Sequence, residues 1–129
     1  MMNMNLRSDL GRVRGLGSAK GGTHHWWMQR LTAVALVPLC LWFVAAVVYL
    51  AGADYTSAAA WMRSPWHAAL LLALIVTLFY HAQLGIQVVL EDYIHVEWVK
   101  VTAVVALRFA AILLGLMAAL AVLRVYLGA

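Results

Sequence analysis

Three long apolar runs constrain this chain more than any other feature of its sequence. Residues 31–53 carry no charged side chain, residues 64–90 carry none apart from two histidines, and residues 101–123 carry a single arginine. Each run reaches the roughly 20 residues that an α-helix needs to cross about 30 Å of hydrocarbon. The sequence therefore predicts an all-α membrane protein with three transmembrane helices, approximately over residues 30–53, 65–91 and 98–125.

The composition excludes the main soluble classes of protein. Of the 129 residues, 66% are hydrophobic and only 11% are charged, whereas a water-soluble chain carries about 25% charged residues. A transmembrane β-barrel is also excluded, because its strands alternate apolar and polar residues and these runs do not. The net charge of +4 does not indicate nucleic acid, since five of the nine basic residues precede the first apolar run. That asymmetry is typical of membrane topology.

The same charge pattern predicts the orientation and the boundaries of the spans. The positive-inside rule puts an N-terminal segment, residues 1–29, on the cytoplasmic side or its organellar equivalent, and the transmembrane anchor then covers residues 30–129. The loop at 54–63 is expected outside and the loop at 91–100 inside. Ser64-Pro65 predicts the start of the second helix, because serine is a favoured N-cap and proline suits the first helical position.

His81 is the candidate site residue that the sequence singles out. It lies ten residues before Glu91, so at helical rise it sits about 15 Å from the inner boundary. A polar ring at that depth is costly and is often functional. One interpretation is a neutral histidine that hydrogen-bonds to a neighbouring helix. The other is an axial ligand of a haem iron, for which neutral imidazole is common.

The residues around His81 are compatible with haem. Thr77 and Gly85 lie one turn to either side of it on the same helical face, and both are small enough to leave room for a flat macrocycle. Gly85 alone is also compatible with ordinary close helix packing. Gln83 and Gln87 point away from that face, so they are expected to meet another helix or a cavity.

Three residues near the inner ends of the helices are candidates for further binding roles. Tyr93 can donate a hydrogen bond to a quinone carbonyl and Asp92 can help relay protons, although tyrosine also belongs in the interfacial aromatic belt and Asp92 can simply cap the helix. Arg30 can pair with a haem propionate, since guanidinium binds carboxylates bidentately. Plain positive-inside anchoring explains Arg30 equally well.

A haem held by two histidines needs two imidazoles at similar depth, and only His81 is central. The second ligand must then come from another polypeptide, which predicts a hetero-oligomer or, as the weaker alternative, a symmetric dimer. Arg108 is expected to extend toward the inner surface or to neutralise an acid of a partner. The sequence assigns no role to the other four histidines, which are His24, His25, His67 and His95.

Two segments resemble the small hydrophobic membrane-anchor subunit of succinate dehydrogenase, the cytochrome b small subunit or D-type chain of respiratory complex II. The first is HAQLGIQVVLEDY, with His81-Ala82-x-x-Gly85 followed by Asp92-Tyr93. The second is GSAKGGTHHWWMQRLTAVALVPL, residues 17–39, which contains Arg30-x-Thr32-Ala33. The resemblance covers nearly the whole chain.

The resemblance implies a four-subunit assembly in a bacterial cytoplasmic or mitochondrial inner membrane. Its partners would be a flavoprotein that oxidises succinate, an iron–sulfur subunit and a larger cytochrome b membrane subunit. The three helices would form half of a heterodimeric bundle that binds haem b and reduces ubiquinone, with no catalysis by this chain alone. Carried over by residue, His81 would be the haem axial ligand and Tyr93 the quinone hydrogen-bond donor. Asp92 would support the quinone site, and Arg30 would lie near the propionates and the quinone.

Two alternatives remain open on sequence alone. A fumarate reductase anchor would run the reaction in the opposite direction, which cofactor potentials decide and this sequence does not. A noncatalytic membrane adaptor or small transporter subunit would use His81 for packing or proton relay. Transporters more often contain broken helices, whereas Pro38 is the one helix-breaking proline within the expected spans.

Overall fold

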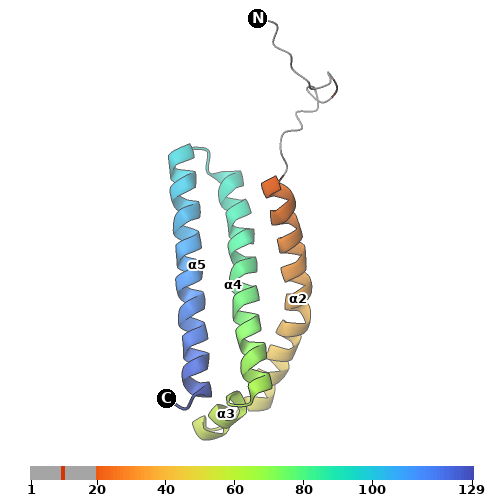
Figure 1. The fold of residues 1–129 in the computed structure, drawn as a ribbon, viewed down its shortest axis with the longest axis vertical. Helices are drawn as coiled ribbons and strands as arrows, with labels where there is room; N and C mark the ends of the chain where they lie inside the picture. The colour runs from red at the N-terminus through yellow and green to blue at the C-terminus, as the bar shows by residue number, and fades with distance from the viewer. Residues whose placement is uncertain (1–9, 11–19) are drawn as a thin grey trace, which may run out of the picture.

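The computed structural model describes Leu10 and residues 20–129, which form four helices and no strand. They are α2 (Lys20–Leu50), α3 (Tyr55–Met62), α4 (Pro65–Tyr93) and α5 (Glu97–Tyr126). Figure 1 shows the three long helices side by side, with α3 lying across one end. All three long helices are apolar enough to cross a membrane, which confirms the predicted all-α membrane fold. Most of the expected inner-side segment, residues 1–29, lies outside the described residues.

The start of α4 follows the local sequence signal. Ser64 occupies the N-cap position and Pro65 is the first helical residue, as expected, although the Ser64 side chain makes no capping hydrogen bond. Helix α2 instead begins at Lys20, ten residues before the expected span, because the stretch before Arg30, with its histidines and tryptophans, continues the same helix. Each long helix has 29 to 31 residues. At 1.5 Å per residue that is about 45 Å, more than the hydrocarbon thickness.

The connection between α2 and α4 contains a short helix that the apolar pattern does not predict. The chain leaves α2 through Gly52, whose φ of 82° is a left-handed conformation that suits glycine. Asp54 then caps α3 by accepting a 2.9 Å hydrogen bond from the Ser57 backbone N–H. The C-terminal end of α3 is hydrogen-bonded to α5, because Nε of the C-cap residue Arg63 donates to the Val125 carbonyl at 3.2 Å.

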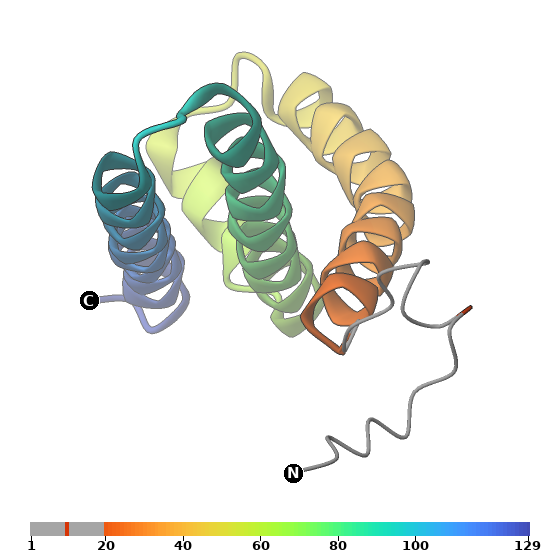
Figure 2. The same cartoon turned by 90° about the horizontal axis from the view of Figure 1, so that it is seen from above.

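Helix α4 is the centre of the packing. It contacts α2 on one side and α5 on the other, and the view from above shows the three helices in a row with α4 between its neighbours (Figure 2). The buried hydrophobic side chains of the described residues are few and mostly small: Ala46, Ala59, Ala68, Leu71, Leu74, Leu84 and Val122. Most apolar side chains are exposed, as expected for surfaces that lipid or partner helices cover.

His67 lies at the end of the bundle that carries α3. Its ring stacks on Trp61 with centroids 3.9 Å apart, and the Trp42 ring lies near both, 5.8 Å from Trp61 and 6.4 Å from His67. The His67 Nδ1 atom lies 2.8 Å from the Trp61 carbonyl oxygen. The packing of α3 against α4 therefore accounts for this histidine.

Candidate functional site

His81 lies near the middle of α4, twelve residues before the helix ends at Tyr93. At helical rise this is about 18 Å from that end. Its side chain is half-buried and faces α2 closely enough for a hydrogen bond.

The hydrogen-bond partner of His81 is Thr32 on α2. The Thr32 hydroxyl oxygen lies 2.8 Å from His81 Nδ1. The same oxygen lies 2.7 Å from the carbonyl oxygen of Met28 and 3.1 Å from that of Gln29, both on its own helix. Thr32 is the one buried polar residue in the described part of the chain, with 8% of its surface exposed. The hydrogen bond to a neighbouring helix that the alternative, packing interpretation of His81 predicts is thus present.

Within the described residues, the hydrogen bonds of the His81 ring use Nδ1 and leave Nε2 without a partner. An imidazole with one bonded and one free nitrogen is the usual form of a histidine ligand. Residues 20–129 contain no cluster of three or more metal-ligating side chains. The donor set therefore fits one half of a haem site shared between two chains, and it does not fit a metal ion held by this part of the chain alone.

The surface around Gly85 is compatible with a large planar group. A Cβ atom added to Gly85 would meet nothing within 4 Å. Gly115 on α5 gives a contrast, since its added Cβ would lie 3.7 Å from the Phe79 ring. Close packing of helices within this chain therefore does not explain Gly85, and the space over it is open.

The structure does not join the inner-end candidates to His81 through any hydrogen bond or ion pair between described residues. Tyr93 is the last residue of α4 and is 79% exposed, and the neighbouring Asp92 is exposed as well. The Arg30 guanidinium lies over the Trp26 ring, 5.3 Å from its centroid. These side chains are accessible to a partner or a ligand at the end of the bundle where α2 begins and α4 ends.

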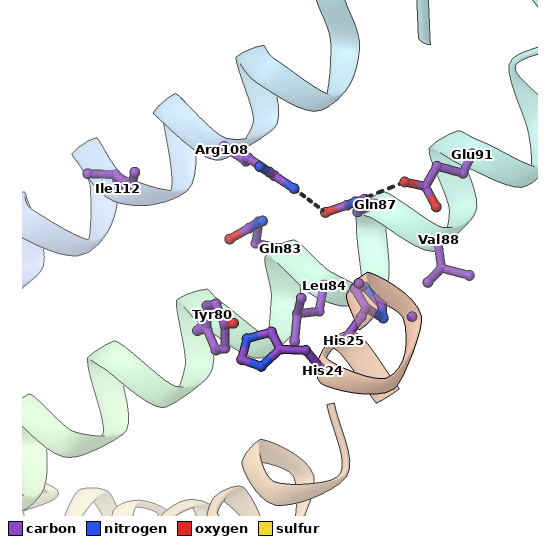
Figure 3. A pocket seen from close by; sticks show the side chains of 12 residues that line it. His24, His25, Tyr80, Gln83, Leu84, Gln87, Val88, Glu91, Arg108 and Ile112 are labelled. Atoms are coloured by element: carbon purple, nitrogen blue, oxygen red, sulfur yellow. Dashed lines mark hydrogen bonds between the residues drawn. The ribbon is translucent and has the colours of Figure 1, made fainter. Parts of the chain in front are cut away.

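A pocket of about 670 Å³ opens between the three long helices on the α5 side of α4 (Figure 3). Helix α2 contributes His24 and His25, α4 contributes Gln83 and Gln87, and α5 contributes Arg108. This confirms that the two glutamines face a cavity. Tyr80 also lines the pocket, and nothing in the sequence analysis had pointed to it.

Hydrogen bonds link three polar side chains of this pocket, one on α5 and two on α4. Arg108 Nη2 donates to Gln87 Oε1 at 3.5 Å, a long contact, and Gln87 Nε2 donates to Glu91 at 2.8 Å (Figure 3). The side chain of Arg108 is thus directed toward α4. His25 Nε2 is buried and has no hydrogen-bond partner among the described residues. These groups offer donors and acceptors at the inner end, and His81 is not among the residues that line the pocket.

Thr32 is the site residue whose contact with His81 the sequence did not reveal. The available signal was a hydroxyl group in an otherwise apolar run. In the structure Thr32 is twelve residues from the start of α2, just as His81 is twelve residues from the end of α4. Because the two helices run in opposite directions, equal offsets from the same end of the bundle give equal depth.

Comparison with known proteins gives a consistent family. The family model described as succinate dehydrogenase/fumarate reductase transmembrane subunit matches residues 4–122. The succinate dehydrogenase hydrophobic membrane anchor subunit of Rickettsia bellii is 35% identical over 112 residues, which cover 87% of this chain and 90% of the relative.

More distant relatives have the same description. The succinate dehydrogenase membrane anchor subunit of Reclinomonas americana is 31% identical over 96 residues, covering 72% of this chain and 80% of the relative. The hydrophobic membrane anchor subunit of Paracoccus denitrificans is 30% identical over 81 residues, covering 63% of each chain. No solved structure gives a significant match.

Proposed function

Because this chain belongs to the succinate dehydrogenase/fumarate reductase transmembrane subunit family, we propose that His81 supplies one axial ligand of a haem b shared with a partner chain. The chain is a multi-pass membrane anchor subunit of succinate dehydrogenase. The observation that carries the haem proposal is the ring of His81, which is half-buried near mid-helix, with Nδ1 bonded to Thr32 and Nε2 without a partner among the described residues. The open space over Gly85 supports it.

The second imidazole would come from the larger cytochrome b membrane subunit, completing the bundle of which this chain forms half. Haem b, when bound, supplies a centre that accepts and returns one electron. The chain itself holds the ligand ring at the required depth. At the inner end, Arg30 would bind the propionates.

Tyr93 and Asp92 would form this chain's part of the ubiquinone site. The Tyr93 phenol would donate a hydrogen bond to a quinone carbonyl, and Asp92 would support proton delivery. Both side chains are exposed at the end of α4. This exposure supports the role, because it leaves them accessible to the larger membrane subunit and the iron–sulfur subunit, which would supply the rest of the site. The flavoprotein would bind on the iron–sulfur subunit and oxidise succinate.

The proposed location is a bacterial cytoplasmic or mitochondrial inner membrane, with the N-terminus on the cytoplasmic or matrix side. The excess of basic residues before the first apolar run supports this orientation. A membrane-impermeant thiol reagent tests it in a chain carrying Cys40→Ala and Thr56→Cys. We expect labelling from the outer side of the membrane, and labelling from the inner side alone would contradict it.

The haem proposal is tested by replacing His81 in the whole complex. We expect His81→Ala to remove or strongly weaken the b-type band in the reduced-minus-oxidised spectrum. His67→Ala is the matched control, because His67 lies on the same helix but stacks on Trp61 at the outer end. A full b-type band in purified His81→Ala complex would contradict the assignment.

A further inference from the structure

We infer that Thr32 is a positioning residue that holds His81 in the tautomer with hydrogen on Nδ1 and so leaves the Nε2 lone pair for iron. This inference rests on the proposed ligand role of His81. It adds a residue from a second helix to the site and assigns a direction to the hydrogen bond between the two side chains.

The direction follows from counting protons on one hydroxyl group. Thr32 has a single hydroxyl hydrogen, and its oxygen lies 2.7 Å from the Met28 carbonyl oxygen. A carbonyl can only accept, so a contact of that length requires the hydroxyl to donate to it. The oxygen then has only lone pairs to offer His81 at 2.8 Å. Nδ1 must therefore be the donor and carry the ring hydrogen.

The opposite arrangement leaves a costly contact behind. If the hydroxyl donated to Nδ1, the Thr32 and Met28 oxygens would face each other at 2.7 Å with no hydrogen between them. The Gln29 carbonyl oxygen, at 3.1 Å, would be a second oxygen facing the hydroxyl with no hydrogen between them. Lone pairs of oxygens held this close without an intervening hydrogen repel each other. The backbone of α2 therefore selects the tautomer of a histidine on α4.

The tautomer decides which nitrogen can bind a metal. A ring nitrogen that carries hydrogen has no lone pair in the ring plane, so only the other nitrogen can act as a ligand. With hydrogen on Nδ1, that atom is Nε2, at the end of the ring that Thr32 leaves free. The hydrogen bond also limits rotation of the ring, as outer-shell partners of histidine ligands generally do.

The geometry of Thr32 suits this role because it is fixed before any ligand binds. In a helix the threonine side chain divides between two rotamers, one of which bonds a carbonyl of the preceding turn. The bond to Met28 selects that rotamer, and burial of Thr32 keeps water from competing for it. Donation from Nδ1–H also makes Nε2 a stronger electron donor, which stabilises ferric over ferrous iron.

The test compares three variants of the assembled complex. Thr32→Val removes the hydroxyl at nearly constant volume, and Thr32→Ser restores it. Thr102→Val is the matched control, because the Thr102 hydroxyl makes the same kind of bond to its own helix, 2.7 Å to the Trp98 carbonyl. The readouts are haem transfer to apomyoglobin and the reduction midpoint potential of the haem. Neither readout depends on succinate or quinone turnover.

We expect Thr32→Val to weaken haem retention by roughly 10- to 100-fold and to shift the midpoint potential to a more positive value. Thr32→Ser is expected to restore both, and Thr102→Val to change neither. Thr32→Val with wild-type retention and potential would overturn the inference, as would a Thr32→Ser variant that behaved like Thr32→Val. If Thr32→Val failed to assemble, Thr32→Ala removes the same hydroxyl without a methyl in its place and is read in the same way.

The His81→Ala complex separates this inference from the proposal beneath it. If His81→Ala kept the full b-type band, the ligand assignment would fail and the role of Thr32 would fail with it. If His81→Ala lost the band while Thr32→Val matched wild type, the ligand assignment would stand and only the positioning role would be wrong.

Discussion

Replacing Gly85 with a larger residue is expected to lower haem affinity more than it affects the folding of this chain. An added Cβ at Gly85 meets no atom of the chain within 4 Å, so an alanine side chain brings no steric cost within the three-helix unit. Replacing glycine by alanine inside a helix is favourable by roughly 1 kcal/mol. Gly85→Ala should therefore leave the stability of the anchor unchanged or slightly raised.

Haem binding should respond differently, because a helical side chain leans toward the N-terminus of its helix. The leucine side chain of Gly85→Leu would therefore extend over the turn that carries His81. If the macrocycle lies there, the added carbons overpack its site, and overpacking costs about 1–3 kcal/mol. That range corresponds to a roughly 5- to 150-fold loss of haem affinity. Gly85→Ala, with a single added carbon, should lose much less.

The assay measures haem per purified complex by the pyridine haemochrome spectrum, together with the thermal unfolding midpoint. Ala110→Leu is the control, since Ala110 is an exposed small residue of α5 far from His81 along the chain. Wild-type haem content and retention in Gly85→Leu would refute the reasoning, because no flat group could then cover this turn of α4. A large loss of stability with Gly85→Ala would contradict the open space described for this position.

Two further predictions concern the two ends of the bundle. Tyr93→Phe should lower quinone reduction by about tenfold while succinate oxidation with an artificial acceptor is kept, and an equal fall in both activities would make Tyr93 structural. At the outer end, hydrogen bonds from the side chain and backbone N–H of Ser57 hold the pKa of Asp54 below its ordinary value. The stability this contributes is present above the ordinary carboxyl pKa and is lost as pH falls through the lowered one. Asp54→Ala should therefore have a lower melting temperature than wild type at neutral pH, and the difference in melting temperature should disappear in strong acid. A difference that persisted in strong acid would show that the cap does not act through the carboxylate.

Hydropathy was sufficient to predict the fold class because bilayer thickness converts an uncharged run directly into a spanning helix. The same signal could not place the start of α2. The residues between Lys20 and Arg30 mix polar side chains with glycine, tryptophan and methionine, yet they continue the same helix. It also missed α3, whose eight residues are too short to give a periodic signal, although Asp54 is a typical N-cap residue.

The candidate site was predictable in depth but not in its contacts. Counting residues from Glu91 gave the depth of His81, since rise per residue is nearly constant. It could not identify Thr32 as the partner, because residues 31–50 of α2 are apolar on nearly all sides and their sequence therefore does not specify which face meets α4. Nor could it predict that Tyr80 lines the pocket, because that depends on how α4 and α5 pack.

Hydrogen bonds between polar side chains favour one rotation of α4 about its own axis, which its apolar surface alone does not determine. Helix α4 bonds α2 through His81 and Thr32, and it bonds α5 through Gln87 and Arg108. Such contacts contribute only about 0.6 kcal/mol each on average within a membrane, so they add little to total stability. Between rotations of an apolar helix that pack almost equally well, however, two such contacts together, about 1.2 kcal/mol, favour one rotation by roughly eightfold. Because the two contacts lie on different faces of α4, only one rotation satisfies both, and that rotation gives His81 its orientation. A substitution at Arg108 should therefore affect the haem spectrum through the rotation of α4, even though Arg108 lies on the far side of that helix.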